Sequence, residues 1–270
     1  MPDVLNPFDQ TRISFEDEGG HGAPVVFLGG FLDSVDEVRV SHLSRSLSGG
    51  EFRRIYVDHR GLGKSEKPHN PAAYGMRFRA FDPITVLDAL GLPQAHFIGL
   101  SWGGRLVFGI GEHAPERALS LVAIGQQPYA WPDSPLTRAV TAGIALARSE
   151  GTVAVVDALA KFWGVDFPIE TRLRWVENDP AALAAMWEAV VHEGPVSRDL
   201  RSWRVPCLIC LGSGDGDFIE LARRAAAEIP GARFVELAGS DHYRAHVSED
   251  EALVEAVLST LRSSPGEQQT

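Results

Sequence analysis

Short apolar runs alternate along the chain with longer segments in which apolar residues recur at helical spacing. Runs of strand length occupy residues 25–28, 54–57, 96–100, 119–124, 205–211 and 233–237. Segments of helical period occupy residues 79–90, 102–113, 219–229 and 248–261. Such an alternation is typical of a mostly parallel sheet covered by helices. The pattern therefore predicts an α/β fold.

The alternation stops in the middle of the chain. Over residues 127–203 the strand-like runs disappear, and the sequence becomes rich in Ala, Arg, Leu and Trp and is interrupted by prolines. Strand character returns at Val205. Because 270 residues can hold one α/β core together with an insertion, we predict a core domain of residues 1–126 and 204–270. Residues 127–203 are predicted to form a helical cap.

Composition and charge narrow the class of partner. The hydrophobic share of 44% is typical of a globular domain, and the formal charge of −11 repels nucleic-acid phosphates and acidic membrane surfaces. No basic segment followed by an apolar stretch opens the chain, and no apolar run approaches the length of a membrane span. We expect a cytoplasmic protein that acts on a small molecule and binds neither nucleic acid nor membrane. Its oligomeric state is left open between monomer and homodimer.

Two cysteines, Cys207 and Cys210, have C-x-x-C spacing. They lie in the apolar run 205–211, where residues three apart point to opposite faces of a strand, so we expect buried thiols and no metal site. Gly61 and Gly63 form a G-x-G pair that lacks the third glycine and the helix start of a nucleotide loop. We therefore expect no metal and no cofactor.

The segment Gly99-Leu100-Ser101-Trp102-Gly103 matches the pattern G-x-S-x-G. In this motif a strand turns sharply into a helix and presents the serine at the turn, and glycines flank it because side chains there would collide with neighbouring backbone. The run 96–100 precedes the motif and a helical segment follows it. Ser101 is thus the predicted nucleophile.

A serine hydroxyl needs a base to remove its proton and a carboxylate to orient that base. With this motif the acid and then the histidine are expected later in the chain. Asp215 directly follows one predicted strand and His242 follows the next, so Ser101, Asp215 and His242 form the predicted triad. Asp217 remains an alternative acid, and His246 remains an alternative base. A metal pair formed by the two histidines lacks a third ligand motif.

Acyl transfer also creates an oxyanion that requires fixed backbone donors. The amide of Trp102, at the start of the helix after Ser101, is the first predicted donor. The second is predicted to be the amide of Phe31, in the Gly29-Gly30-Phe31 loop after the run 25–28, with Gly30 as the alternative. An ordinary tight turn is the other interpretation of this glycine pair.

The segment Asp58-His59-Arg60-Gly61-Leu62-Gly63-Lys64-Ser65 resembles the D-x-R-G-x-G-x-S loop of α/β-hydrolase-fold enzymes. The Ser101 elbow, Gly212-x-x-Asp215 and Gly239-x-x-His242 occur where that family has its triad. The resemblance covers residues 11–262, and it implies a mostly parallel eight-stranded sheet flanked by helices, with a helical cap inserted after the sixth strand. Many relatives have a His-Gly pair where this chain has Gly29-Gly30.

The nucleophile distinguishes branches of that family. Haloalkane dehalogenase and epoxide hydrolase relatives typically carry aspartate followed by tryptophan at the elbow, whereas this chain has Ser101 followed by Trp102. This difference favours attack on a carbonyl carbon. The leading hypothesis is a hydrolase of a small apolar carboxylic ester or lactone that works through an acyl-enzyme. A C–C bond hydrolase of a β-diketone-like substrate and a small-ligand-binding protein without turnover are the alternatives.

Aromatic residues in the predicted cap could roof a pocket over the triad or simply pack its helices on the core. They are Tyr129, Trp131, Phe162, Trp163, Phe167, Trp175 and Trp187. Arg172, Arg174 and His192 could meet a substrate carboxylate or be solvated. An aromatic roof favours an apolar or aromatic acyl group.

Overall fold

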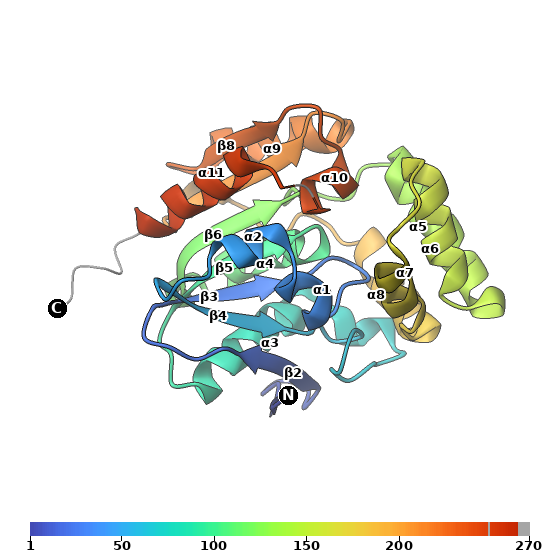
Figure 1. Ribbon diagram of the computed structural model, residues 1–270, viewed down its shortest axis with the longest axis horizontal. Coiled ribbons are helices and arrows are strands. Elements are labelled where there is room, and N and C mark those ends of the chain that lie inside the picture. The colour runs from blue at the N-terminus through green and yellow to red at the C-terminus, as the bar shows by residue number, and fades with distance from the viewer. Residues whose placement is uncertain (248, 264–270) are drawn as a thin grey trace.

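One sheet of eight strands runs through the molecule (Figure 1). The computed structural model describes residues 1–247 and 249–263, with the backbone alone described at 246 and 247. The strands lie in the order β1-β2-β4-β3-β5-β6-β7-β8, and all pairings from β4 to β8 are parallel. The strand bounds are Asp3–Leu5 (β1), Arg12–Asp17 (β2), Ala23–Leu28 (β3), Phe52–Val57 (β4), Ala95–Leu100 (β5), Ala118–Ile124 (β6), Cys207–Gly212 (β7) and Arg233–Leu237 (β8). The predicted eight-stranded, mostly parallel sheet is confirmed.

Helices cover both faces of this sheet. Buried apolar residues of α3, α4 and α9 belong to the core on one face, and those of α1, α2 and α11 belong to the core on the other. The α-helices are Val35–Arg39 (α1), His42–Ser46 (α2), Met76–Ala89 (α3), Trp102–His113 (α4), Pro135–Glu150 (α5), Val153–Trp163 (α6), Ile169–Val176 (α7), Pro180–Val191 (α8), Asp217–Glu228 (α9), His242–Val247 (α10) and Glu251–Arg262 (α11). Short 3₁₀ helices occupy Pro71–Tyr74 (η1), Pro115–Arg117 (η2) and Leu200–Ser202 (η3).

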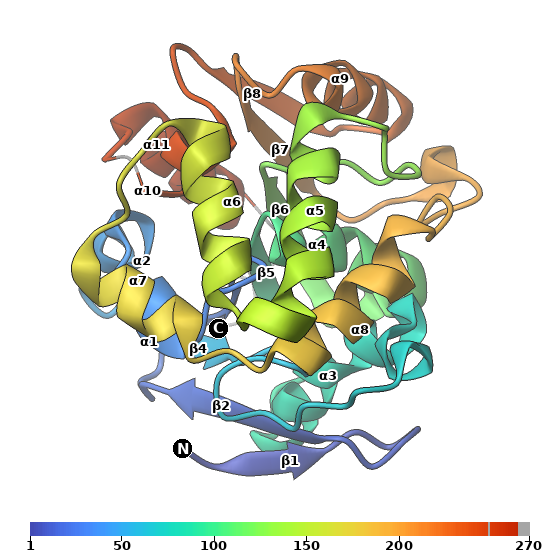
Figure 2. The ribbon, with the colours of Figure 1, turned by 90° about the vertical axis from the view of Figure 1, so that its right-hand side faces the viewer.

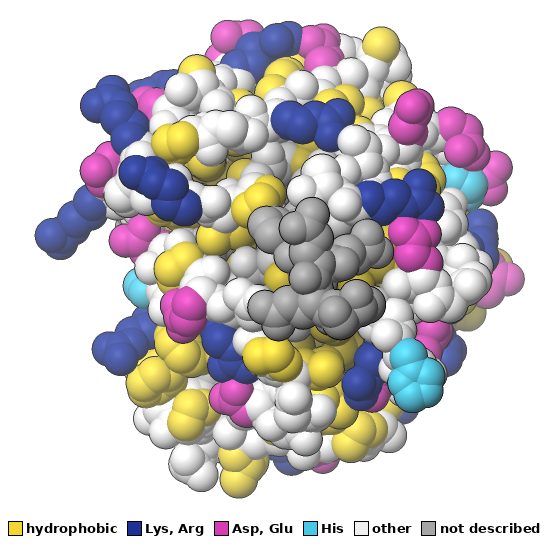
Figure 3. All heavy atoms as spheres, turned by 90° about the vertical axis from the view of Figure 1, so that its left-hand side faces the viewer, with side chains coloured by type: hydrophobic (Ala, Val, Ile, Leu, Met, Phe, Trp, Pro, Cys, Tyr) yellow, Lys and Arg dark blue, Asp and Glu magenta, His cyan; other side chains and the backbone are white. Residues whose placement is uncertain are grey.

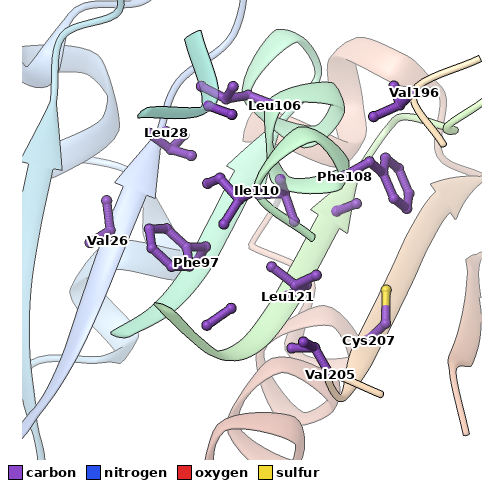
Figure 4. Packing of buried hydrophobic residues seen from close by; sticks show 14 of the residues in the cluster. Val26, Leu28, Phe97, Leu106, Phe108, Ile110, Leu121, Val196, Val205 and Cys207 are labelled. Carbon is purple, nitrogen blue, oxygen red and sulfur yellow. The ribbon is translucent and has the colours of Figure 1, made fainter. Parts of the chain in front are cut away.

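The central strands read as continuous apolar runs because both of their faces are buried. Val26 and Leu28 of β3 pack toward α4, while the alternate residues Val25 and Phe27 belong to the opposite core. Figure 4 shows Leu106 and Ile110 of α4 beside Leu28 and Phe97 of the sheet, in one cluster that also includes Val26.

Cys207 and Cys210 are buried free thiols in β7, and they belong to the cores on opposite faces of the sheet. The interpretation of this pair as buried strand residues is therefore confirmed. Burial raises the pKa of the Cys207 thiol to about 12, because an apolar environment disfavours the thiolate.

The apolar runs do not reveal the first two strands. β1 and β2 pair antiparallel at the edge of the sheet, and their sequences DVL and RISFED mix polar and apolar residues. The last helix also begins later than its periodicity predicts. Asp250 caps it by accepting hydrogen bonds from the backbone N–H groups of Ala252 and Leu253. Residue 248, the predicted start of this helix, lies outside the described residues.

The helices α5 to α8, here called the helical insertion, follow one another between β6 and β7. Figures 1 and 2 show that they lie beyond the carboxyl ends of the parallel strands. Arg105, one turn into α4, joins the two ends of this segment. Its guanidinium donates to the carbonyl oxygens of Tyr129 at 2.7 Å and Gly194 at 2.9 Å, and it forms an ion pair with Glu193 at 3.0 Å. The helical insertion is thus fastened to the helix that follows Ser101.

The face opposite the helical insertion carries basic and acidic side chains interspersed with apolar ones (Figure 3). The strongly negative net charge is therefore not spread as one acidic surface over this face. Within residues 1–247 and 249–263, no helix combines the length and the apolar character needed to cross a bilayer.

Candidate active site

Ser101 lies at the sharp turn between β5 and α4. Its backbone has a φ of +48° and a ψ of −106°, a strained conformation for a residue with a side chain. A Cβ atom on Gly99 would lie 2.2 Å from the carbonyl oxygen of Gly103, and one on Gly103 would lie 2.2 Å from that of Leu28. The glycines of the motif therefore let three backbone segments approach closely, as the sequence motif requires.

His242 begins α10, after β8, and faces Ser101. Its Nε2 lies 2.7 Å from Oγ of Ser101, so these side chains share a hydrogen bond although they are 141 residues apart in sequence. The imidazole is buried, with the ring of Trp163 parallel to it at a centroid distance of 6.2 Å. Desolvation lowers the pKa of His242 to about 4, against the opposing effect of Asp241. At neutral pH the imidazole is uncharged and can accept a proton from Ser101.

Asp215 and Asp217, the two candidate acids, lie between β7 and the start of α9. Both line a pocket of about 270 Å³ that His242 also lines. Oδ2 of Asp215 accepts a hydrogen bond from the amide of Gly212 at 2.9 Å, whereas its buried Oδ1 has no partner among the described residues. No hydrogen bond joins either carboxylate to His242 in the part of the chain that the structure describes. The side chain of His246, the alternative base, lies outside that part.

The environment of Asp215 favours its protonated form. Desolvation raises its pKa to about 7, partly offset by the hydrogen bond from Gly212, and the nearby charge of Asp241 raises it further. An imidazolium formed on His242 would supply the positive charge that this carboxyl group lacks.

The two predicted oxyanion donors lie beside Ser101. Phe31 and Trp102 line the same pocket as Ser101, and their rings are in contact at a centroid distance of 5.3 Å. Neither backbone amide donates a hydrogen bond to a described residue. In contrast, the amide of Gly30, the alternative donor, is engaged with Oδ2 of Asp33 at 2.8 Å. The geometry thus leaves Phe31 and Trp102 as the available pair.

A further residue supports the oxyanion loop, and sequence reasoning assigned it no role. His59 Nε2 donates a hydrogen bond to the carbonyl oxygen of Gly29 at 2.9 Å, and the amide of Gly103 donates to the same oxygen. Desolvation lowers the pKa of His59 to about 4, so it is neutral at pH 7. Its place in the sequence offered one signal: His59 follows β4 and Gly29 follows β3, and these two strands pair parallel, so their following loops lie at the same edge of the sheet.

The main pocket has a volume of about 500 Å³ and extends from Ser101 to the helical insertion. Four of the seven aromatic residues predicted to roof it do line it, namely Trp131, Trp163, Trp175 and Trp187. The other three do not. Phe167 packs against Trp175 at a centroid distance of 4.8 Å, Phe162 lines the smaller pocket beside Asp215, and the ring of Tyr129 lies under the guanidinium of Arg224.

Of the three polar residues predicted to meet a substrate carboxylate, one lines the main pocket and two do not. Arg174 lines the main pocket and forms an ion pair with Glu37, which lines it too. Arg172 instead pairs with Asp157 at 2.6 Å. His192 follows α8 and is not part of the pocket wall. Arg174 is the one of these three residues that a bound molecule could reach from Ser101.

A model of the α/β hydrolase fold family matches residues 23–147, from β3 through the Ser101 elbow into α5. The matched segment holds the first strands of the parallel sheet and the Ser101 elbow. The chain is 29% identical over 234 residues to a putative carbamate hydrolase, RutD, of Caulobacter sp. strain K31, covering 78% of this chain and 81% of the relative. It is 32% identical over 116 residues to bifunctional epoxide hydrolase 2 of Mus musculus, covering 43% of this chain and 20% of that protein.

Solved structures agree with the fold. The enol-lactonase of Burkholderia xenovorans LB400 superposes with a TM-score of 0.81 at 22% identity, covering 97% of this chain and all of that chain. The esterase EaEST of Exiguobacterium antarcticum superposes with a TM-score of 0.82 at 23% identity, with the same coverage. At these identities the superpositions establish the fold alone. Together with the curated relatives, the family match supports hydrolase activity as the general class.

Proposed function

We propose that this protein cleaves a small apolar carboxylic ester or lactone through an acyl-enzyme on Ser101. The observation that carries the proposal is the 2.7 Å contact between Ser101 Oγ and His242 Nε2 at the wall of the main pocket. Hydroxyl and imidazole are in hydrogen-bond reach, and the imidazole is neutral at pH 7, as a general base must be.

In the proposed reaction, Ser101 Oγ attacks the carbonyl carbon of the substrate while His242 Nε2 accepts the hydroxyl proton. The tetrahedral intermediate collapses, the C–O bond to the leaving group breaks, and His242 returns the proton to the departing alkoxide. A water molecule then attacks the acyl-enzyme and gives its proton to His242. The bond between the acyl carbon and Oγ of Ser101 then breaks, and His242 returns the proton to Oγ, which releases the carboxylic acid and restores the Ser101 hydroxyl. In a lactone the alcohol remains attached to the acid.

The amides of Phe31 and Trp102 would stabilise the negative oxygen of each tetrahedral intermediate. Both line the pocket with Ser101, and neither has another described acceptor. Donors that are already in place before reaction can contribute about 3 to 4 kcal/mol each to transition-state stabilisation.

Asp215 is the proposed acid. Its free Oδ1 is buried in the small pocket that His242 also lines, so an ionised Asp215 would stabilise the imidazolium that forms during reaction. Asp217, at the first position of α9, is the alternative on the same loop.

The main pocket supports an apolar acyl group. Trp102, Trp131 and the three tryptophans of the helical insertion bring indole surfaces to its wall, together with Leu136, Val140 and Leu159. A small acyl chain packed among them would lose little hydrogen bonding with water. The relatives and neighbours named above include an esterase, an enol-lactonase, a putative carbamate hydrolase and an epoxide hydrolase, and the first three are named for substrates that contain a carbonyl carbon.

The test uses the purified protein with p-nitrophenyl acetate and butyrate, a γ-lactone and an N-alkyl carbamate. Wild-type protein should hydrolyse at least one oxygen ester, and Ser101→Ala should lose about a thousandfold or more in kcat. Ser149→Ala is the matched control, because Ser149 is exposed on α5 and does not line the main pocket. Circular dichroism should show that both variants are folded.

A fluorophosphonate probe with intact-mass analysis separates the alternatives. Labelling of wild type but not of Ser101→Ala is expected. Labelling without ester or lactone turnover would exclude the proposed substrate class and favour C–C cleavage of a β-diketone, or carbamate hydrolysis if that substrate is consumed. Absence of both labelling and turnover would refute the nucleophile and favour a ligand-binding protein without turnover.

A further inference from the structure

Three polar contacts join α7 and the residues after it to the oxyanion loop and α1. Trp175 Nε1 donates to Oδ1 of Asp33 at 3.1 Å, and Asn178 Nδ2 donates to the carbonyl oxygen of Leu32 at 2.9 Å. Arg174 forms an ion pair with Glu37. These contacts connect segments about 140 residues apart in sequence, and all three start from one end of a single short helix. The helical insertion therefore meets the core at the oxyanion loop.

The carboxylate of Asp33 accepts one hydrogen bond from α7 and another from the oxyanion loop, each through a different oxygen. While Oδ1 receives the indole N–H of Trp175, Oδ2 receives the amide of Gly30 at 2.8 Å. The amide of Asp33 also donates to the carbonyl oxygen of Gly30, at 3.3 Å, which closes the turn. Because the Gly30 carbonyl carbon and the Phe31 nitrogen share one peptide plane, holding Gly30 at both its polar groups fixes the direction of the Phe31 N–H.

Gly30 lies directly against the nucleophile. A Cβ atom on Gly30 would be 3.8 Å from Cβ of Ser101 and 2.9 Å from Oδ2 of Asp33. A small rotation of this turn would consequently change the distance between the Phe31 amide and any oxyanion formed on the Ser101 adduct.

Glu37 makes a similar bridge one turn further on. One carboxylate oxygen accepts hydrogen bonds from the backbone N–H of Ser34 at 2.8 Å and from its hydroxyl at 2.6 Å, which caps α1. The other oxygen pairs with Arg174. Both bridging acids, both partners from α7 and Ser101 itself line the main pocket.

We propose that Asp33 is a positioning residue that couples the α7 wall of the acyl pocket, through Trp175, to the oxyanion loop, through Gly30. The inference rests on the proposed function, since it concerns how the Phe31 donor is held. A substrate that packs against Trp175 and Arg174 thereby also presses on the turn that directs this donor. Asp33 touches no reacting atom, and its effect on the reaction passes through the Gly30 amide.

Asp33→Asn is the sharpest test because it keeps the shape of the side chain and removes one acceptor. An asparagine can accept one of the two N–H groups, but its own NH₂ then faces the other donor. We expect kcat for the short p-nitrophenyl ester to fall about 10- to 100-fold, with KM within about twofold of wild type. Asp36→Asn is the matched control, because Asp36 is exposed on α1 and pairs only with Arg39 among the described residues.

The double variant distinguishes coupling from general loss of structure. Trp175→Phe removes the indole N–H but keeps an aromatic ring, and alone it should lower kcat about threefold. In Asp33→Asn/Trp175→Phe the NH₂ no longer meets a donor, so the amide oxygen can accept from Gly30, and kcat should recover at least threefold relative to Asp33→Asn. Equal kcat for Asp33→Asn and Asp36→Asn, or multiplicative losses in the double variant, would overturn the proposal.

The NMR resonances of the Gly30 and Phe31 backbone amides test the coupling without any measurement of turnover. In ¹⁵N–¹H spectra, the resonances of Gly30 and Phe31 should shift in Trp175→Phe and stay in place in Asp36→Asn. Unmoved resonances in Trp175→Phe would refute the coupling even if Asp33→Asn failed to fold. Shifted resonances in a protein without ester turnover would instead refute the proposed function and leave the coupling intact.

Discussion

The imidazole of His59 donates a hydrogen bond to the carbonyl oxygen of Gly29, one residue before the turn that carries the oxyanion donor. Both residues follow neighbouring parallel strands, β4 and β3. The same carbonyl oxygen receives the amide of Gly103 from the elbow, so it joins the nucleophile, the oxyanion loop and the loop after β4.

His59→Phe should weaken this junction. The variant keeps a planar ring but leaves the buried Gly29 carbonyl with one donor, and such a loss costs about 1 to 3 kcal/mol of unfolding free energy. Urea denaturation at pH 7.5 measures it. His21, which is exposed, provides the control His21→Phe, for which little change is expected. A stability of His59→Phe equal to that of the control would show that the hydrogen bond is dispensable.

Asp215→Asn should separate the two candidate acids. Removing the charge that would stabilise the His242 imidazolium is expected to lower kcat about a thousandfold or more, by analogy with the acid of other serine triads. Asp217→Asn, two residues away on the same loop, should change kcat less than about fivefold. Steady-state kinetics on the best ester compares the two variants. The reverse order of effects would assign the acid role to Asp217.

Gly103→Ala should prevent the elbow from forming. The new methyl group would lie 2.2 Å from a backbone oxygen of β3, which cannot move aside as a flexible side chain could. We expect a loss of about 3 kcal/mol or more in unfolding free energy, or insoluble protein. Gly194→Ala is the matched control, since nothing lies within 4 Å of a Cβ atom at that position. Wild-type stability in Gly103→Ala would contradict the packing described for the elbow.

His96 should make stability depend on pH below neutrality. Desolvation lowers its pKa from 6.5 to about 4 in the folded protein, where Nδ1 lies 2.8 Å from the hydroxyl of Ser120. Between these two pH values the unfolded chain binds a proton that the folded chain does not, so stability falls as the pH falls from 6.5 to 4. Because only one proton is bound by this group, the loss of unfolding free energy is at most on the order of 3 kcal/mol.

The variant His96→Gln lacks this titration. The stability of His96→Gln relative to that of wild type should therefore increase as the pH is lowered from 7 to 4, as measured by urea denaturation at several pH values. A difference between the two proteins that stays constant over this range would show that His96 is not held in its neutral form.

The burial of each strand explains which strands the sequence predicted. The central strands, which are buried on both faces, are largely apolar, and this made β3 to β7 visible as apolar runs. The edge strand β8 is more exposed and was visible through the alternation in RFVEL, whereas β1 and β2, at the other side of the sheet, mix polar and apolar residues and escaped detection. The last helix was placed too early because Ser248-Glu249-Asp250-Glu251 matches the sequence pattern of a capping box, whereas the residue that caps the helix is Asp250.

By itself the sequence predicted the elbow. Gly99 is required by contacts with Gly103 and Gly104 a few residues away, and Gly103 is required by the close approach of the end of β3, so the short motif carries the signature of both contacts. The order of Ser101, Asp215 and His242 after successive strands likewise followed from the chain, because parallel strands bring their carboxyl ends to one edge of the sheet.

Only the tertiary structure decided which polar groups support the oxyanion loop and which tryptophans face the pocket. His59, Asp33 and Trp175 meet that loop from separate segments of the chain, and no local pattern distinguishes them from surface or core residues of the same type. The physical reason is that a hydrogen bond depends on distance and direction to within a few tenths of an ångström, and the packing of the helical insertion on the core determines both.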